Sequence, residues 1–251
     1  MKIKSVLISQ PKPCTEKSPY YDLAEKYKVK LDFRQFIQVE GVSGKSFRAH
    51  RINILDYTAV IFTSRTAIDH FFRICEEVRV QVPDTMKYFC NSESIAVYLQ
   101  KYIVYRKRKI FYGKKRFADL VEVLVKHSEE KFLVPVSDMH NDQIPVLLKR
   151  HKVNFTKTVL YKTVSSDLSD LKMSDYDVLV FYSPSGIASL MANFPEFQQN
   201  SIKIATFGPS TQKAAKEAHL KVDIKVPSPE FPSMTMALDK FITEQNKKAG
   251  K

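Results

Sequence analysis

Short apolar runs alternate with stretches of helical periodicity along most of the chain. Extended runs are predicted at residues 6–9, 33–39, 59–63, 87–90, 103–106, 132–136, 156–164, 178–182, 202–207 and 222–226. Amphipathic helices are predicted at residues 20–27, 66–78, 92–102, 117–126, 142–151, 186–193, 211–219 and 234–245. This alternation of strand and helix is typical of parallel α/β units.

One segment of this pattern occurs twice. The sequence Ala-Val-Ile-Phe-Thr-Ser-Arg-Thr-Ala-Ile at residues 59–68 is echoed by Val-Leu-Val-Phe-Tyr-Ser-Pro-Ser-Gly-Ile at 178–187, an offset of 119 residues (183 − 64). Residues 89–94 and 207–212 form a second pair with an offset of 118 residues (207 − 89). Two pairs at nearly one offset predict two copies of one architecture.

The strand count predicts how the copies divide the chain. After residue 175 there are three core strands, whereas five candidates lie between residues 33 and 136. The second copy is completed if the N-terminal strand joins it. We therefore expect a discontinuous α/β domain of residues 1–35 plus 165–251 and an inserted α/β domain of 40–158, with linkers near 36–39 and 159–164. The predicted fold is two similar parallel-sheet, flavodoxin-like domains joined by a two-strand linker, with a cleft between them; 251 residues suit two domains.

Composition narrows the class of protein. No apolar run is long enough for a membrane span, and the N-terminus lacks the apolar core of a signal peptide. Cys14, Cys75 and Cys90 have no metal-ligand or disulfide spacing, which favours a reducing cytoplasm. The net charge of +13 is compatible with nucleic acid, with a polyanionic small molecule, or with a solvated basic surface. The basic runs are residues 106–109 and 114–116, and no nucleic-acid-binding signature accompanies them.

Four hydroxyl-rich turns follow predicted strands, where ligands of open parallel sheets bind. Their residues are Thr63, Ser64, Arg65 and Thr66; Ser92 to Ser94; Tyr182, Ser183, Pro184, Ser185 and Gly186; and Gly208, Pro209, Ser210 and Thr211. Free N–H groups at helix N-termini attract anions, although Ser and Thr also cap helices without any ligand. Capping alone does not require Ser-Pro-Ser-Gly or Gly-Pro-Ser-Thr, so we expect the backbone to approach a ligand at these two turns.

An ordered set of segments resembles the uroporphyrinogen-III synthase family. The segments are residues 6–11, 61–64 with Ala67, 159–163, 180–186 and 204–214. Each is short, and the specificity lies in their order along nearly the whole chain. The resemblance implies two α/β domains joined by two linkers, the first domain being discontinuous.

The resemblance also implies an activity: cyclisation of the polycarboxylate hydroxymethylbilane to uroporphyrinogen III, with loss of water and inversion of ring D. Tyr161 matches the family's interdomain tyrosine and is the favoured proton donor, with Thr63 and Tyr182 as further hydroxyl candidates; Tyr161 packing as a linker aromatic is the alternative. The substrate-binding residues are those of the four turns, with Ser92 from the second. No cofactor or metal is expected, no histidine is assigned to catalysis, and the chain is expected to be a cytoplasmic monomer that binds neither nucleic acid nor membrane.

Two features depart from the family pattern. Gln10 stands where the family usually has Arg, and Cys90-Asn91-Ser92-Glu93 replaces a Gly-Pro-x-Thr turn. They leave room for a non-catalytic tetrapyrrole-binding or regulatory module on the same scaffold. They also predict that the turns of the second copy hold most of the substrate.

Overall fold

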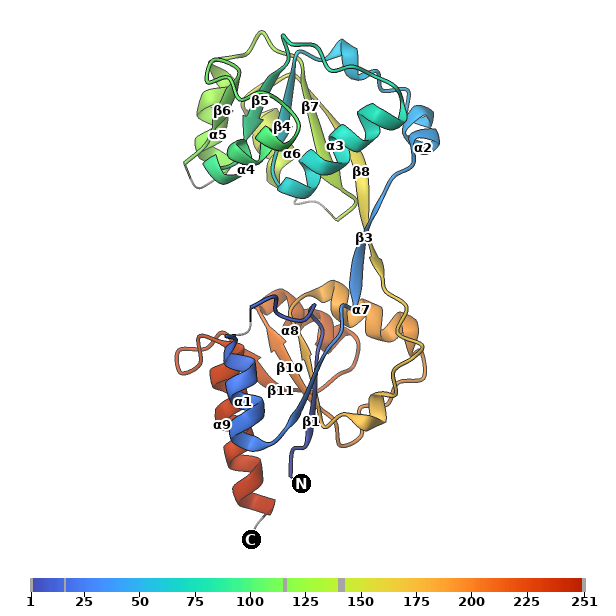
Figure 1. Ribbon diagram of the computed structural model, residues 1–251, viewed down its shortest axis with the longest axis vertical. Helices are drawn as coiled ribbons and strands as arrows, with labels where there is room; N and C mark the ends of the chain where they lie inside the picture. The colour runs from blue at the N-terminus through green and yellow to red at the C-terminus, as the bar shows by residue number, and fades with distance from the viewer. Residues whose placement is uncertain (1, 16, 115–116, 140–142, 250–251) are drawn as a thin grey trace. The chain divides into compact units, whose positions relative to one another are not determined.

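The computed structural model, which describes residues 2–15, 17–114, 117–139 and 143–249, has two compact units (Figure 1). Unit 1 combines Met1–Gln38 with Val164–Lys251, and unit 2 is Val39–Thr163. The chain thus passes from one unit to the other twice. Among the described residues, none of the helices has both the length and the apolar character needed to cross a bilayer.

Unit 1 contains a five-stranded sheet in which the N-terminal strand is internal. Its strands, in spatial order, are β11 (Val222–Val226), β10 (Lys203–Phe207), β9 (Val178–Phe181), β1 (Ser5–Ile8) and β2 (Lys30–Phe33). Neighbouring strands pair in parallel throughout. Strand β1 therefore supplies the strand that the second half of the chain lacks.

Helices cover both faces of this sheet. Helices α1 (Pro19–Tyr27) and α9 (Met234–Ala249) share one core with alternate residues of the strands, and they lie side by side in Figure 1. Helices α7 (Pro184–Asn193) and α8 (Pro209–Glu217) share the core of the other face, next to the short 3-10 helix η3 (Met173–Asp175). Val178 and Val180 belong to the first core, and Leu179 and Phe181 to the second. This period of two explains why the buried strands are apolar at every position.

Unit 2 is organised around a six-stranded sheet. Its strands, in spatial order, are β3 (Ile37–Gly41), β8 (Phe155–Ser165), β7 (Phe132–Ser137), β4 (Ala59–Phe62), β5 (Lys87–Cys90) and β6 (Ile110–Tyr112). Its helices are α2 (Gly44–Ala49), η1 (Ile54–Asp56), α3 (Arg65–Glu77), α4 (Glu93–Tyr98), η2 (Leu99–Lys101), α5 (Phe117–Val125) and α6 (Gln143–Arg150). Helices α3 and α4 pack on one face, and α5 and α6 on the other.

The two sheets have the same spatial order of equivalent strands. If β9 is equated with β4, then β10, β11, β1 and β2 correspond to β5, β6, β7 and β8. Both arrangements have the order 2-1-3-4-5 of a flavodoxin-like sheet. The order along the chain differs between the units. In unit 2 the equivalents of β9, β10 and β11 come first, as β4, β5 and β6, and the equivalents of β1 and β2 come last, as β7 and β8. The sequence repeat at 59–68 and 178–187 marks the equivalent central strands and the helices that follow them.

Two strand predictions differ from the structure: one strand is absent and the other is split into two. Residues 103–106 form no strand; Ile103 and Tyr105 pack against the core of unit 2, and the edge strand β6 begins only at Ile110. The run 33–39 is split, because the buried Phe36 separates β2 from β3 and its carbonyl accepts a hydrogen bond from the Ser166 N–H. The predicted helix 142–151 is observed as α6 from Gln143, and Asp142 lies outside the described residues.

Asp177 anchors the N-terminal strand to the rest of unit 1. Its Oδ2 accepts hydrogen bonds from the backbone N–H groups of Lys4 (2.6 Å) and Ser5 (3.0 Å). Because hydrogen bonds to a charged group stabilise more than neutral ones, Asp177→Ala is expected to lower the free energy of unfolding by about 2 kcal/mol. Urea denaturation measures this change, with Asp175→Ala, an exposed neighbour, as the matched control. Equal losses in both variants would contradict the anchoring role.

Candidate functional site

The candidate site residues gather at the carboxyl ends of the central strands in each unit. In flavodoxin-like sheets ligands bind where the strand order reverses, which is between β1 and β9 in unit 1 and between β7 and β4 in unit 2. Each of these positions is followed by a turn and the N-terminus of a helix, α7 after β9 and α3 after β4. Each unit therefore presents its own group of hydroxyl and backbone N–H donors.

In unit 2, Ser64 connects the turn after β4 to Tyr161 of β8. Ser64 is the N-cap of α3, and its Oγ accepts a hydrogen bond from the Ala67 N–H at 3.0 Å. The same oxygen lies 3.2 Å from the hydroxyl of Tyr161. Either hydroxyl can donate in this pair, since the Ser64 oxygen has a second lone pair besides the one that accepts from Ala67. When Ser64 donates, the phenolic proton of Tyr161 is free for another acceptor.

The ring of Tyr161 is held by His70, one helical turn into α3. The two rings are stacked with centroids 5.0 Å apart, and Tyr161 is 8% exposed. The Nε of Arg73 donates to Nδ1 of His70 at 3.1 Å, which requires a neutral imidazole with its proton on Nε2. Burial and the neighbouring Arg73 charge lower the pKa of His70, in agreement with the neutral form. His70 thus lies against the candidate proton donor, a contact that local sequence spacing does not indicate, and the expectation that no histidine is catalytic stays a prediction.

The other turn residues of unit 2 make separate contacts of their own. Thr63 and Thr66 are half-buried, while Arg65 is exposed with its guanidinium 5.3 Å from the ring centre of Tyr98. Ser92 precedes the short helix α4 without capping it, and its Oγ lies 3.1 Å from that of Ser94. Glu93 is contacted by the hydroxyl of Tyr112 at 3.3 Å. The turn at residues 90–93 thus adds an acidic side chain beside the Ser64 turn.

In unit 1, Ser183 repeats the role of Ser64. It is the N-cap of α7, and its Oγ accepts a hydrogen bond from the Gly186 N–H at 3.2 Å, with Pro184 in the first helical turn. A Cβ on Gly186 would lie 3.4 Å from the ring of Phe181 and 3.6 Å from Oγ of Ser9. These are ordinary van der Waals distances, so the space beside β1 does not by itself require glycine at position 186.

Gly208 shapes the second turn of unit 1. It has φ of +88° and ψ of 149°, a conformation that is essentially restricted to glycine, and it leads into Pro209 at the start of α8. Ser210 is exposed, whereas Thr211 is 1% exposed and its hydroxyl has no hydrogen-bond partner in the described part of the chain. Thr211 consequently faces the interior rather than offering its hydroxyl to a ligand.

Tyr182, which follows β9, is paired with a residue that the sequence analysis missed. Its hydroxyl is hydrogen-bonded to that of Tyr20 in α1, and its ring stacks on Phe207 with centroids 5.6 Å apart. Burial raises the pKa of both tyrosines. Residues 20 and 182 are far apart in the sequence. They come together because β1, which precedes α1, pairs with β9 in the sheet.

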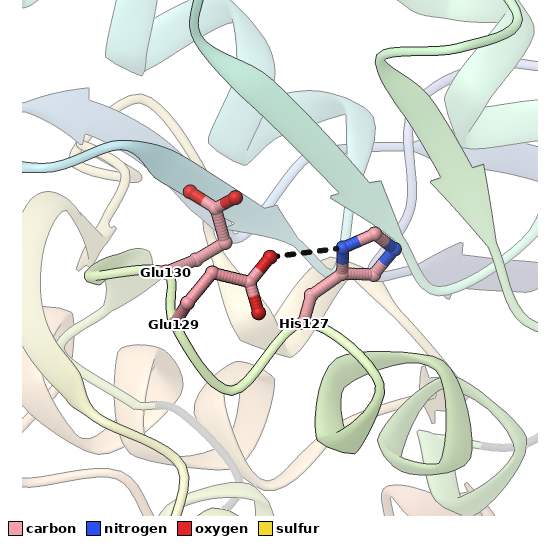
Figure 2. A group of neighbouring side chains, drawn as sticks. All are labelled: His127, Glu129 and Glu130. Atoms are coloured by element: carbon pink, nitrogen blue, oxygen red, sulfur yellow. Dashed lines mark ion pairs between the residues drawn. The ribbon is translucent and has the colours of Figure 1, made fainter.

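One group of the described residues has side chains close enough to share a metal ion: His127, Glu129 and Glu130 (Figure 2). Nδ1 of His127 lies 3.6 Å from Glu129, but the ammonium group of Lys87 is paired with both glutamates. Burial raises the pKa of Glu130, and the hydrogen bonds from Lys87 and Thr58 more than offset this effect and lower it. Lys87 thus already occupies both carboxylates, and the group is explained as an ion-paired turn.

Replacement of Gly208 tests how strictly the second turn of unit 1 needs its backbone conformation. A Cβ at this position would meet no atom within 4 Å, so any cost comes from the backbone alone. We expect Gly208→Ala to destabilise the protein by about 1–3 kcal/mol. Gly208→Asn is the control, because Asn tolerates the left-handed helical region but not this one. Thermal denaturation in which the Asn variant regains wild-type stability would contradict the assignment.

The chain is similar to known proteins in sequence pattern and in fold. A family model described as uroporphyrinogen-III synthase HemD matches residues 29–236. The structure of uroporphyrinogen-III synthetase from Helicobacter pylori is similar, with 14% identity, a TM-score of 0.58, and coverage of 96% of this chain and 100% of that chain. A mutant uroporphyrinogen III synthase from Thermus thermophilus has 12% identity and a TM-score of 0.52, over 97% of this chain and 99% of that chain. No curated protein matches the sequence. The likeness confirms the predicted α/β fold with two parallel-rich sheets.

Proposed function

The chain belongs to the uroporphyrinogen-III synthase HemD family, and from this membership we propose that it cyclises hydroxymethylbilane to uroporphyrinogen III. The reaction removes water from the substrate and inverts its ring D. We further propose that the protein acts as a monomer in the cytoplasm and needs no cofactor for this step. The observation that carries the proposal is the recurrence of hydroxyl-rich helix N-termini at the carboxyl edges of both sheets.

These edges suit a substrate with many carboxylates. The N-termini of α3, α7 and α8 carry a partial positive charge and N–H groups that can hold carboxylates without a cationic side chain. The net charge of +13 attracts such a substrate from a distance. In this proposal the turns at residues 63–66, 182–186 and 208–211 bind the carboxylates.

Tyr161 is the proton donor in this proposal. Donation from its hydroxyl to the leaving oxygen of the substrate breaks the carbon–oxygen bond and releases water, after which the electron-rich pyrrole carbons close the ring. Ser64 supports the role because it can donate to the Tyr161 oxygen and so direct the phenolic proton outward. Neutral His70 holds the ring without competing for the proton. Tyr182 is the weaker candidate, since its hydroxyl is engaged with Tyr20.

The enzyme's second task is to control the geometry of closure. The protein must hold the flexible substrate in the folded geometry that leads to inversion of ring D. The uninverted ring closure is then disfavoured. The glutamate at position 93 and Gln10 are the features that argue for the other possibility, a module that binds tetrapyrroles without converting them.

The direct experiment supplies purified protein with fresh hydroxymethylbilane and separates the product isomers. Formation of the type III isomer at a rate proportional to protein concentration is the expected result. Formation of the spontaneous type I isomer alone would contradict the enzymatic proposal. Tight porphyrinogen binding together with that result would instead support the non-catalytic module.

Replacement of Tyr161 tests the proton donor. Tyr161→Phe retains the ring and its stacking on His70 but removes the acid, so kcat is expected to fall by about a hundredfold. The matched control is Tyr57→Phe, because Tyr57 is half-buried against the same core but precedes the amino end of β4, away from the carboxyl edge. Isomer analysis at saturating substrate measures both variants, with circular dichroism to check the fold. Unchanged kcat in Tyr161→Phe would show that the proton comes from elsewhere.

A further inference from the structure

Unit 2 has a pocket at the opposite edge of its sheet from Ser64 and Tyr161. The pocket, of about 740 Å³, lies between α3 and the segments that lead into β5 and β6. Its walls include Phe72, Cys75, Tyr88, Tyr102, Arg106 and Lys109. Residues 80–86 and 102–109 precede β5 and β6, so the pocket opens at the amino edge of the parallel sheet. The proposed reaction does not use any of these residues.

The floor of this amino-edge pocket is apolar and aromatic. The rings of Phe72 and Tyr102 are stacked with centroids 4.5 Å apart and planes 8° from parallel. Cys75 and Tyr88 are each 4% exposed, and burial raises the pKa of the Cys75 thiol to about 12, so it is uncharged near neutral pH. The volume is in the range of pockets that bind small molecules. This lining suits a ligand with a flat, apolar body.

Most charges around the pocket are neutralised by the protein itself. Asp69 accepts hydrogen bonds from Tyr98, Tyr102 and Lys101. The guanidinium of Arg73 donates to backbone carbonyls of unit 2 and is paired with Glu77. The ion pair between Arg106 and Asp84 spans 3.9 Å. Glu76 also lines the pocket and is exposed, and its carboxylate has no ion-pair partner among the residues that the structure describes.

Among the lining cations that the structure describes, Lys109 is the one without a partner. It is half-buried, and its ammonium group has no hydrogen-bond or ion-pair partner among the residues that the structure describes. Lys107 and Arg108 are exposed beside it in the same turn and add to the positive potential. Of the second predicted basic run, Lys115 and Arg116 lie outside the described residues. The pocket therefore combines an apolar floor with an unneutralised cation at its edge.

We propose that the amino-edge pocket binds a small amphipathic anion, with an apolar ring system on the floor and a single carboxylate or sulfonate at Lys109. A fully apolar ligand would cover the ammonium group of Lys109 without giving it a partner, which costs free energy. A polyanion would place its additional negative charges near the carboxylates of Asp69 and Asp84. The site is separate from the turns that hold the substrate. It makes unit 2 a binding module for a second small molecule.

Fluorescence titration with anilinonaphthalene sulfonate tests this proposal. The probe has an aromatic body and one sulfonate, and the neutral N-phenyl-1-naphthylamine has nearly the same body without the charge. The native protein is expected to bind the sulfonate in a saturable, single-site manner, and at least about tenfold more tightly than the neutral analogue. Lys109→Gln is expected to remove most of this difference. Lys107→Gln, which removes the same charge from an exposed position of the same turn, is expected to leave it unchanged.

The location of the probe is checked independently by hydrogen exchange. Protection on binding is expected in peptides covering residues 80–88 and 102–110. Protection confined to residues 63–66, 182–186 or 208–211 would place the probe at the strand carboxyl ends and overturn the proposal. Equal weakening by Lys107→Gln and Lys109→Gln would also overturn it, because a diffuse basic surface would then explain the binding. Neither outcome depends on turnover of hydroxymethylbilane.

Discussion

Parallel pairing of the central strands is the constraint on which the other features depend. Because β1 pairs in parallel with β9, and β4 with β7, the five equivalent strands of each sheet end at one edge, whereas the additional strand β3 runs antiparallel to β8. The turns that leave this edge lead directly into helices, so helix N-termini and hydroxyl side chains collect there. An antiparallel sheet would divide the same turns between two edges. The chemistry proposed for the carboxyl edges is thus a consequence of strand direction.

Arg73 connects this constraint to the proposed proton donor. Its guanidinium donates to the carbonyls of Val42 and Leu160, which belong to the two segments that cross between the units, and its Nε fixes the tautomer of His70. A Cβ on Gly41 would lie 2.6 Å from the guanidinium carbon, so glycine there lets Arg73 pass. One side chain therefore holds β3, β8 and α3 together and positions the histidine against Tyr161.

The same strand direction separates two kinds of surface in unit 2. The carboxyl edge exposes helix N-termini and small hydroxyl side chains, which suit carboxylates. The amino edge is formed by the segments that enter β5 and β6, and there aromatic side chains fill the space beside α3. The two edges differ in chemistry because α3 and α4 begin at the first, so that their N-terminal N–H groups lie there. The fold can therefore carry two unrelated ligands on one sheet.

The sequence by itself determined the alternating α/β pattern, the two copies and the hydroxyl-rich turns, because these depend on local periodicity and on residues that start helices. It also located Ser64, Ser183 and Gly208 at the starts of their helices, where the structure finds them. It was wrong about the strand at 103–106, since a short apolar run can pack against a core as well as pair in a sheet. Only the tertiary structure revealed the pairing of Tyr20 with Tyr182, the stacking of His70 on Tyr161, and the inward position of Thr211. These contacts join elements far apart in the chain or depend on which way a helix faces, and neither is encoded in local spacing.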